Sequence, residues 1–273
     1  DKNAAQTKLT FNFDGEGKNG IIIKDNTLIS DLSISYKTNT INASDTQTLF
    51  DMKNNHGIVF QNLDINVDTT GSPFIGGNMY VLHASKSSYK LKGNVNIVTY
   101  GDRTNIMSTS PDGVITIGSD TRVKLETFGR NSKLSGGGII NLNSNAFLEG
   151  HTYGKESVGF GNSTIKLSDN AQMNIVTEDE YGYGVFGGSL NTSGDSRVNI
   201  KTSGFNAEGI KDSKNSFSDN SIINIQTLGD NGEGIIQSNT MLSDNAQLNV
   251  DIQGPNAAGI SQNQISLSGK SQL

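Results

Sequence analysis

Basic and aromatic side chains gather in one stretch of this sequence, where their types and spacing could bind an acidic ligand. Between Lys86 and Lys133 there are eight basic and four acidic residues, whereas eleven acidic and four basic residues lie between Glu178 and Gly254. Arginine and lysine pair with carboxylates, and aromatic rings pack against the faces of sugars. The stretch therefore predicts an acidic sugar as the ligand.

The elements that must position these residues follow from an internal repeat. The hexapeptide LSDNAQ occurs at residues 167–172 and again 75 residues later, at 242–247, and 75 is three times 25. Three columns keep one residue class at the 25-residue interval: Asn or Asp (Asp120, Asn145, Asn170, Asp195, Asn220, Asn245), Thr (Thr127, Thr152, Thr177, Thr202, Thr227), and Gly before an apolar residue (Gly159, Gly184, Gly209, Gly234, Gly259). Self-similarity at a fixed period is typical of a solenoid, in which each repeat contacts only its neighbours.

Apolar residues within each unit are spaced by two, as at Met173 and Ile175, which is the period of a strand. We therefore predict an all-β chain that forms a right-handed parallel β-helix (β-solenoid) of about ten coils. Its 25-residue period is regular from about residue 115 and looser before it. The whole chain, 1–273, is expected to form one domain. Earlier strands are expected at LTFNF (9–13), LSISY (32–36), LDINV (63–67) and NVNIV (94–98).

The Asn and Asp residues of the first column are expected in turns between strands, where they tolerate the left-handed backbone conformation. Stacked from coil to coil about 4.8 Å apart, their side chains could form a hydrogen-bonded ladder. A second column faces outward and could line a glycan groove, or it could be the solvated edge of a regular ladder. Its members are Asn174, Asn199, Asn224 and Asn249.

The repeated strands VNIKT, INIQT and MNIVT, with their Asn, Thr, Gly and aliphatic columns, resemble the right-handed parallel β-helix of the pectin-lyase-like class. The Asn-rich, cysteine-free chain also resembles the binding region of serine-rich repeat adhesins of lactobacilli. That second resemblance implies an extracellular adhesin, anchored to the bacterial cell wall through parts outside this chain. It also implies binding of acidic polysaccharides such as pectic galacturonan, or of epithelial or mucus glycoproteins, favoured at acid pH.

The composition excludes several classes of protein and of binding site. Without cysteine there are no disulfides or thiolate metal sites, and no run of residues predicts membrane insertion. A net charge of −6 makes a poor nucleic-acid binder. We expect a monomer without cofactor or metal. Apolar columns are still occupied at Ile265, Leu267 and Leu273, so we expect a module excised from a longer surface protein.

Stacking the coils places the basic and aromatic residues in rows. Lys124 and Glu126 point outward from their strand, and one coil on Glu149 lies over Lys124 and His151 over Glu126. The residues predicted to bind the ligand are Tyr100, Arg103, Lys124, Phe128, Arg130, Lys133, His151, Tyr153 and Lys155. Alternatively, these charges form ordinary cross-strand pairs, each contributing about 0.2–1 kcal/mol, and the aromatic residues cover loops.

Two further motifs have simpler interpretations. GEGKNG, at 15–20, matches a phosphate-binding glycine pattern, but the strand-like IIIKD follows it instead of a helix, so we predict a turn. The acidic group Glu178, Asp179 and Glu180 could bind calcium, although sequential carboxylates on one extended turn rarely converge.

Catalysis is the main rival function, because a polysaccharide lyase or hydrolase could share this fold. Such chemistry needs convergent carboxylates, or carboxylates holding calcium beside a proton acceptor. Glu126, Glu149 and His151 are the outward candidates, but they alternate with cations, and none of the three histidines lies in a catalytic motif. We therefore expect a non-catalytic adhesin module. A structural spacer of a giant surface protein is the third possibility.

Overall fold

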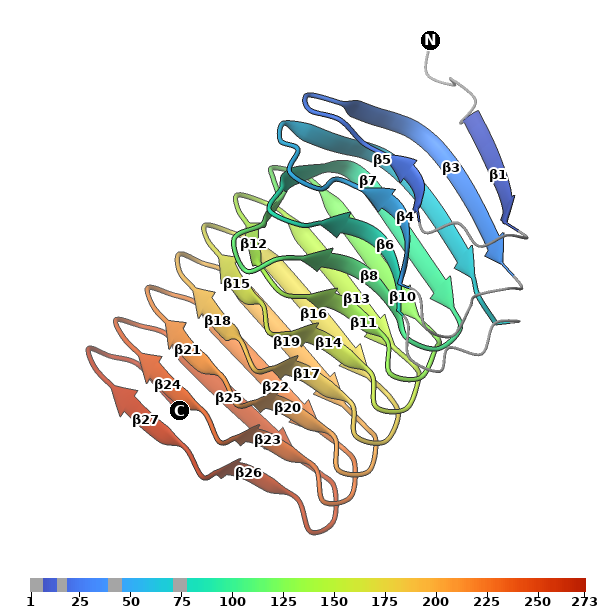
Figure 1. Ribbon diagram of the computed structural model, residues 1–273. Coiled ribbons are helices and arrows are strands. Elements are labelled where there is room, and N and C mark those ends of the chain that lie inside the picture. The colour runs from blue at the N-terminus through green and yellow to red at the C-terminus, as the bar shows by residue number, and fades with distance from the viewer. Residues whose placement is uncertain (1–6, 14–18, 39–45, 71–77) are drawn as a thin grey trace.

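The computed structural model describes residues 7–13, 19–38, 46–70 and 78–273, which wind into a parallel β-helix (Figure 1). One sheet takes one short strand from each turn, and all its pairings are parallel. Its ten strands are separated by nine rises, so the described residues make about nine turns, and the predicted β-solenoid is confirmed. They are β2 (Asn19–Ile22), β4 (Gln47–Asp51), β6 (Met79–Ala84), β8 (Thr104–Thr109), β11 (Lys133–Gly136), β14 (Val158–Gly161), β17 (Tyr183–Phe186), β20 (Glu208–Lys211), β23 (Glu233–Ile236) and β26 (Ala258–Ser261).

The second sheet has 17 strands and covers the rest of the tube. Its longer rows are β1 (Thr7–Phe13), β3 (Leu28–Thr38), β5 (Ile58–Asp68), β7 (Ser88–Tyr100), β10 (Arg122–Thr127), β13 (Phe147–Thr152), β16 (Gln172–Thr177), β19 (Arg197–Thr202), β22 (Ile222–Thr227) and β25 (Gln247–Ile252). Its shorter rows are β9 (Val114–Ile117), β12 (Ile139–Leu142), β15 (Thr164–Leu167), β18 (Ser189–Thr192), β21 (Lys214–Phe217), β24 (Asn239–Leu242) and β27 (Gln264–Leu267). The four early strands predicted from the sequence lie within β1, β3, β5 and β7.

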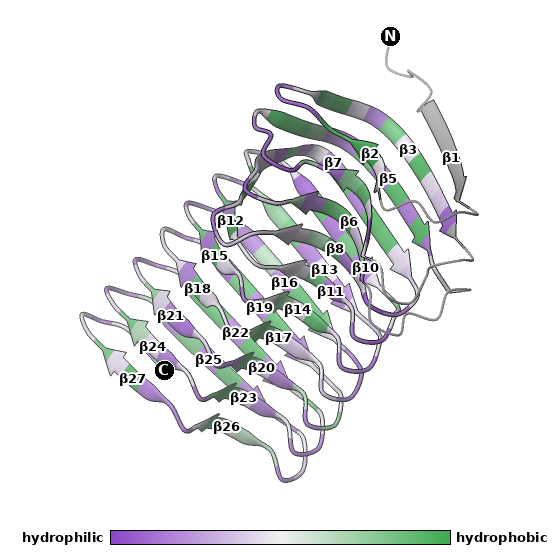
Figure 2. Ribbon diagram, in the orientation of Figure 1, coloured by the Kyte–Doolittle hydropathy of each residue, from purple (hydrophilic) through white to green (hydrophobic). Residues whose placement is uncertain are grey.

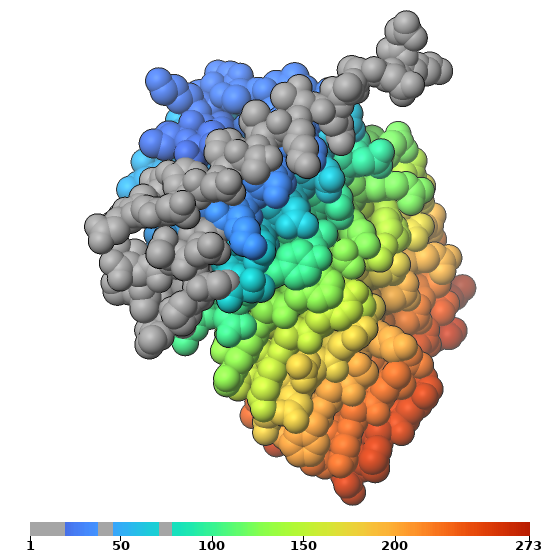
Figure 3. Space-filling model, turned by 90° about the vertical axis from the view of Figure 1, so that its right-hand side faces the viewer, coloured from blue at the N-terminus to red at the C-terminus, as the bar shows by residue number. Residues whose placement is uncertain are grey.

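The repeat becomes regular where one long strand is replaced by two short ones. The first part of β7 pairs with β9 and its last part with β10. Each later coil therefore has two short strands at this place, joined by a turn. Paired residues are 31 apart between β3 and β5, 28 apart between β7 and β10, and 25 apart from β10 to β13 onward. Figure 3 shows the turns as successive bands along the solenoid. The predicted period is therefore confirmed, while the right hand of the helix stays a prediction of the crossover rule.

The core is a thin column of side chains that point into the tube. On β10, Val123 and Leu125 are fully buried while Lys124 is exposed, as the two-residue period predicts. The Thr column is also internal, with every member from Thr127 to Thr227 at most 1% exposed. Hydrophobic positions recur from strand to strand along the rod (Figure 2). No helix among the described residues is long and apolar enough to cross a membrane.

Two asparagine ladders run along the outside, as the sequence predicts. In the turn column, the Asn145 amide donates to Asp120 at 3.2 Å and Asn245 donates to Asn220 at 3.0 Å. In the strand column, Asn199 donates to Asn174 at 2.7 Å. These side chains tie each turn to the next.

The left-handed conformation lies one residue earlier than predicted in most turns. Asp120 has a positive φ of 54°, but in the following coil Ser144 (φ 57°) takes that conformation and Asn145 does not. The later left-handed positions are Asp169, Gly194, Asp219, Asp244 and Gly269. The Asn column is thereby left in a conformation that directs its side chains along the axis.

The glycine-rich motif at 15–20 lies partly outside the described residues, which resume at Asn19. Residues Asn19–Ile22 form β2 and pair with β4, so a strand and not a helix follows the motif, as expected. A pyrophosphate would have no helix N-terminus there to bind.

Candidate ligand-binding edge

Four aromatic side chains form a continuous stack along one edge of the solenoid, and we call them the aromatic stack: Tyr100, Phe128, Tyr153 and His151. Ring centroids are 4.9 Å apart between Tyr100 and Phe128, 4.2 Å between Phe128 and Tyr153, and 3.8 Å between Tyr153 and His151. The predicted aromatic row is therefore confirmed. Our expectation that sugars pack on its ring faces is wrong for the internal rings, because each face already contacts another ring. Those rings present their edges to solvent.

The predicted strand register is confirmed, but the charged side chains form ion pairs with residues other than those opposite them. Lys124 is opposite Glu149, and Glu126 is opposite His151. The Lys124 ammonium instead lies 3.0 Å from Glu126 on its own strand, because side chains two residues apart share a face. His151 Nε2 lies 2.7 Å from Glu178, one turn further along. The cross-strand pairs of the alternative interpretation are therefore not formed among these four residues.

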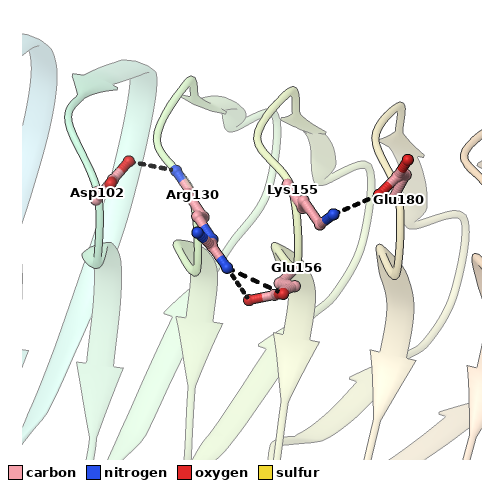
Figure 4. A network of polar contacts seen from close by, with 5 residues as sticks. All are labelled: Asp102, Arg130, Lys155, Glu156 and Glu180. Atoms are coloured by element: carbon pink, nitrogen blue, oxygen red, sulfur yellow. Dashed lines mark hydrogen bonds and ion pairs between the residues drawn. The ribbon is translucent and has the colours of Figure 1, made fainter.

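The turns beside the aromatic stack carry a row of charges, shown in Figure 4. Arg130 lies 3.2 Å from the Glu156 carboxylate, and its backbone N–H donates to Asp102 at 2.9 Å. Lys155 contacts Glu180 at 2.5 Å. Each of these two cations is thus neutralised by an acid of the following turn, and the hydrogen bond from Arg130 holds the pKa of Glu156 below its ordinary value.

Arg103 and Lys133 form no ion pair among the residues that the structure describes. Arg103 occupies a left-handed turn position, with φ at 53°, just after Tyr100. Lys133 begins β11 and extends over the bare backbone of the ten-stranded sheet, since a methyl group built on Gly161 would lie 3.5 Å from its ammonium. The structure therefore keeps Arg103 near the aromatic stack but directs Lys133 onto another sheet.

The acidic turn at 178–180 does not gather its carboxylates around one point. Glu178 contacts His151, and Glu180 contacts Lys155. Asp179 accepts a hydrogen bond from the backbone of Glu180 at 2.7 Å. Within the described ranges, no group of three or more acidic or histidine side chains could hold a metal ion.

One row of possible catalytic residues escaped the sequence analysis. Strand pairing places His83 on β6 between Asp51 on β4 and Ser108 on β8, the order of a hydrolytic triad. No hydrogen bond joins these three described side chains, and Asp51 instead accepts from the backbone of Lys53 at 3.2 Å. The Nδ1 atom of His83 is buried without a partner, and burial lowers its pKa. The row lacks the contacts that activate a serine.

A second arrangement brings two carboxylates together in adjacent turns. Glu208 and Glu233 are paired in register on β20 and β23. Glu208 is only 8% exposed, and this burial raises its pKa, while Lys211 lies 3.2 Å away. Glu233 accepts a hydrogen bond from Ser261. Lys211 contacts only Oε1 of Glu208, whose Oε2 is buried without a hydrogen-bond partner, so for hydrolysis a substrate oxygen would have to reach this buried carboxyl group.

Comparisons with known proteins place few constraints on this chain. No protein-family model matches it, and no curated protein is similar to it in sequence. Among solved structures, it is similar to the A-module of the mannuronan C-5 epimerase AlgE4 of Azotobacter vinelandii, at 12% identity and a TM-score of 0.32. The match covers 97% of this chain and 88% of that one. The fold assignment therefore rests on the strand pairing described above.

Proposed function

We propose that this chain is a non-catalytic adhesin module of the bacterial cell surface that binds an acidic polysaccharide or an acidic glycan of a host surface glycoprotein. The observation that carries the proposal is the row of cations beside the aromatic stack, contributed by successive turns. Arg130 and Lys155 occupy equivalent positions in adjacent turns, about 4.8 Å apart along the axis (Figure 4), and Arg103, in the turn before, lies one residue past the equivalent position. A polymer with one carboxylate per sugar has a comparable spacing between its carboxylates.

Binding at this edge is an exchange of carboxylates. A uronate of the ligand replaces Glu156 at Arg130 or Glu180 at Lys155, and the edges of the rings contact the sugar beside it. Exposed ion pairs contribute about 0–1 kcal/mol each, so one exchange gains little. Several exchanges along one polymer act together, because each bound sugar holds its neighbour at high effective concentration.

Acid strengthens this binding through the charge of the whole chain. The net charge of −6 repels a polyanion at neutral pH and falls to zero near the isoelectric point of 5.1. Glu156 stays ionised in mild acid because its pKa is lowered, so Arg130 is not released there. The gain therefore comes from weaker long-range repulsion, and added salt should reduce it.

The double variant Lys124→Glu/Arg130→Glu should bind polygalacturonate at least tenfold more weakly than the wild-type chain. The physical reason is that two cations of the edge become anions beside an anionic ligand. Affinity electrophoresis in gels that contain the polymer measures this loss.

The matched control is Lys166→Glu/Lys214→Glu, which makes the same change in net charge at exposed lysines of β15 and β21. We expect the control to retain most of the binding. Equal losses in the two variants would mean that only net charge matters, and unaltered binding in the first variant would place the site elsewhere.

A further inference from the structure

A groove runs along the outer face of β16, β19, β22 and β25, on turns beyond most of the aromatic stack. Its volume is about 640 Å³. The side chains of Asn174, Asn199, Asn224 and Asn249 form one wall, one from each turn, and Val176, Lys201, Gln226 and Asp251 form the other. The groove therefore follows the axis of the solenoid and has the same polar group at every step of one wall.

The amides of this wall are fixed in one orientation. Asn199 donates to Asn174 at 2.7 Å, Asn224 to Asn199 at 2.8 Å, and Asn249 to Asn224 at 2.9 Å. Each internal amide thus uses one N–H and one oxygen lone pair within the ladder and keeps one of each for another partner. Because the ladder already restricts these side chains, a ligand that binds them loses less conformational entropy than it would on freely rotating amides.

The charges around the groove disfavour an anionic ligand. Glu149 and Asp251 lie at its two ends, and Lys201 is the cation among its lining residues. Gln226 donates a hydrogen bond to Asp251 at 2.9 Å, and this bond holds the carboxylate at the end of the wall. The walls between the ends carry amides, the apolar Val176 and the single cation Lys201. Such a surface suits a ligand with many hydroxyl groups and no charge.

We propose that this groove binds a neutral polysaccharide, which lies extended along the axis with one sugar unit per turn. Sugar hydroxyls both donate and accept, so they can pair with the free N–H and free lone pair of each amide. The turn spacing of about 4.8 Å is comparable with the length of one sugar in an extended chain. This site is separate from the basic edge around Arg130, so one chain can hold an acidic and a neutral glycan.

The test uses affinity electrophoresis in gels containing β-1,4-galactan, arabinan or mixed-linkage β-glucan, with polygalacturonate as the acidic comparison. The variant Asn199→Leu/Asn224→Leu removes two amides from the groove at nearly constant volume. The control variant Asn220→Leu/Asn245→Leu removes two amides from the other ladder, which also bonds from turn to turn. Circular dichroism checks that both variants keep the strand signal of the wild-type chain.

We expect at least one neutral polymer to retard the wild-type chain and the control, with retardation at least tenfold weaker for Asn199→Leu/Asn224→Leu. Retardation by none of the neutral polymers would overturn the proposal, as would equal loss in the control. If instead polygalacturonate binding depends on Asn199 and Asn224, the groove takes the acidic polymer and the neutral assignment is wrong. The Lys124→Glu/Arg130→Glu variant should leave neutral binding unchanged, so failure of one site is distinguishable from failure of the other.

Discussion

Replacement of Phe160 by alanine is expected to lower the free energy of unfolding by about 3–5 kcal/mol, the usual cost of removing a fully buried aromatic ring. Phe160 is 0% exposed and lies on β14 inside the tube. Its partners in the two adjacent turns are Ser135 and Val185, which are also fully buried. Neither side chain is long enough to fill the space of the ring, Val185 has few alternative rotamers, and the turns above and below hold their strands, so the cavity cannot collapse.

Denaturant unfolding followed by circular dichroism measures this loss, and hydrogen exchange locates it. In a solenoid each turn contacts only its neighbours, so protection should fall most in β11, β14 and β17. The control is Phe128→Ala, which removes a ring that is 41% exposed and stacked outside the core, at a cost of about 1 kcal/mol. Equal destabilisation by the two variants would contradict the assignment of Phe160 to the core.

The variant Gly229→Ala is expected to destabilise the chain by about 3 kcal/mol, because the turns approach too closely to admit a methyl group. A Cβ atom at Gly229 would lie 1.8 Å from the carbonyl oxygen of Gly204, one turn earlier, and 2.6 Å from its carbon. The obstruction is backbone, which cannot rotate away as a side chain can. The same denaturant experiment measures the effect.

Gly118→Ala is the matched control for this prediction. A Cβ atom there would have Asn143 Oδ1 as its nearest neighbour, at 3.9 Å, and the residue has no positive φ. Alanine should therefore leave the stability unchanged or raise it by about 0.4–1 kcal/mol, through the smaller entropy of the unfolded chain. Two variants of equal stability would show that the turns at Gly204 and Gly229 can separate.

Much of the fold could be predicted because a solenoid repeats its local rules. One strand pattern, such as Val123 and Leu125 inside with Lys124 outside, holds in every coil and is confirmed by burial. The 25-residue register also predicts which side chains lie over one another. It therefore predicts both the Asn ladders and the row of Tyr100, Phe128 and Tyr153.

Side-chain partners could not be predicted from register alone. Lys124 is opposite Glu149 but reaches Glu126, because a long flexible side chain contacts acids both along its strand and across it. A glycine column at the turns, including Gly204, Gly229 and Gly254, also went unnoticed. Asp179 interrupts it, although its 25-residue spacing is a signal that could have found it.

A fixed period cannot predict which side chains lie next to one another in the irregular coils. His83 lies 32 residues after Asp51 and 25 before Ser108, so no single period relates the three. Their juxtaposition depends on the lengths of the insertions between β4, β6 and β8. Only the strand pairing shows that these three residues are neighbours. The strand pairing is also needed to find the turn at which the 25-residue register begins.

The central claim is that the chain binds an acidic polymer without cleaving it, and one experiment measures both parts. The protein is incubated with polygalacturonate at about pH 4 and about pH 7, and bound polymer and newly formed reducing or unsaturated ends are followed in the same tubes. We predict more binding in acid and an intact polymer at both pH values. New chain ends would contradict the claim and make Glu208, Glu233 and His83 the first residues to replace, and binding that is unchanged or weaker in acid would contradict the electrostatic mechanism.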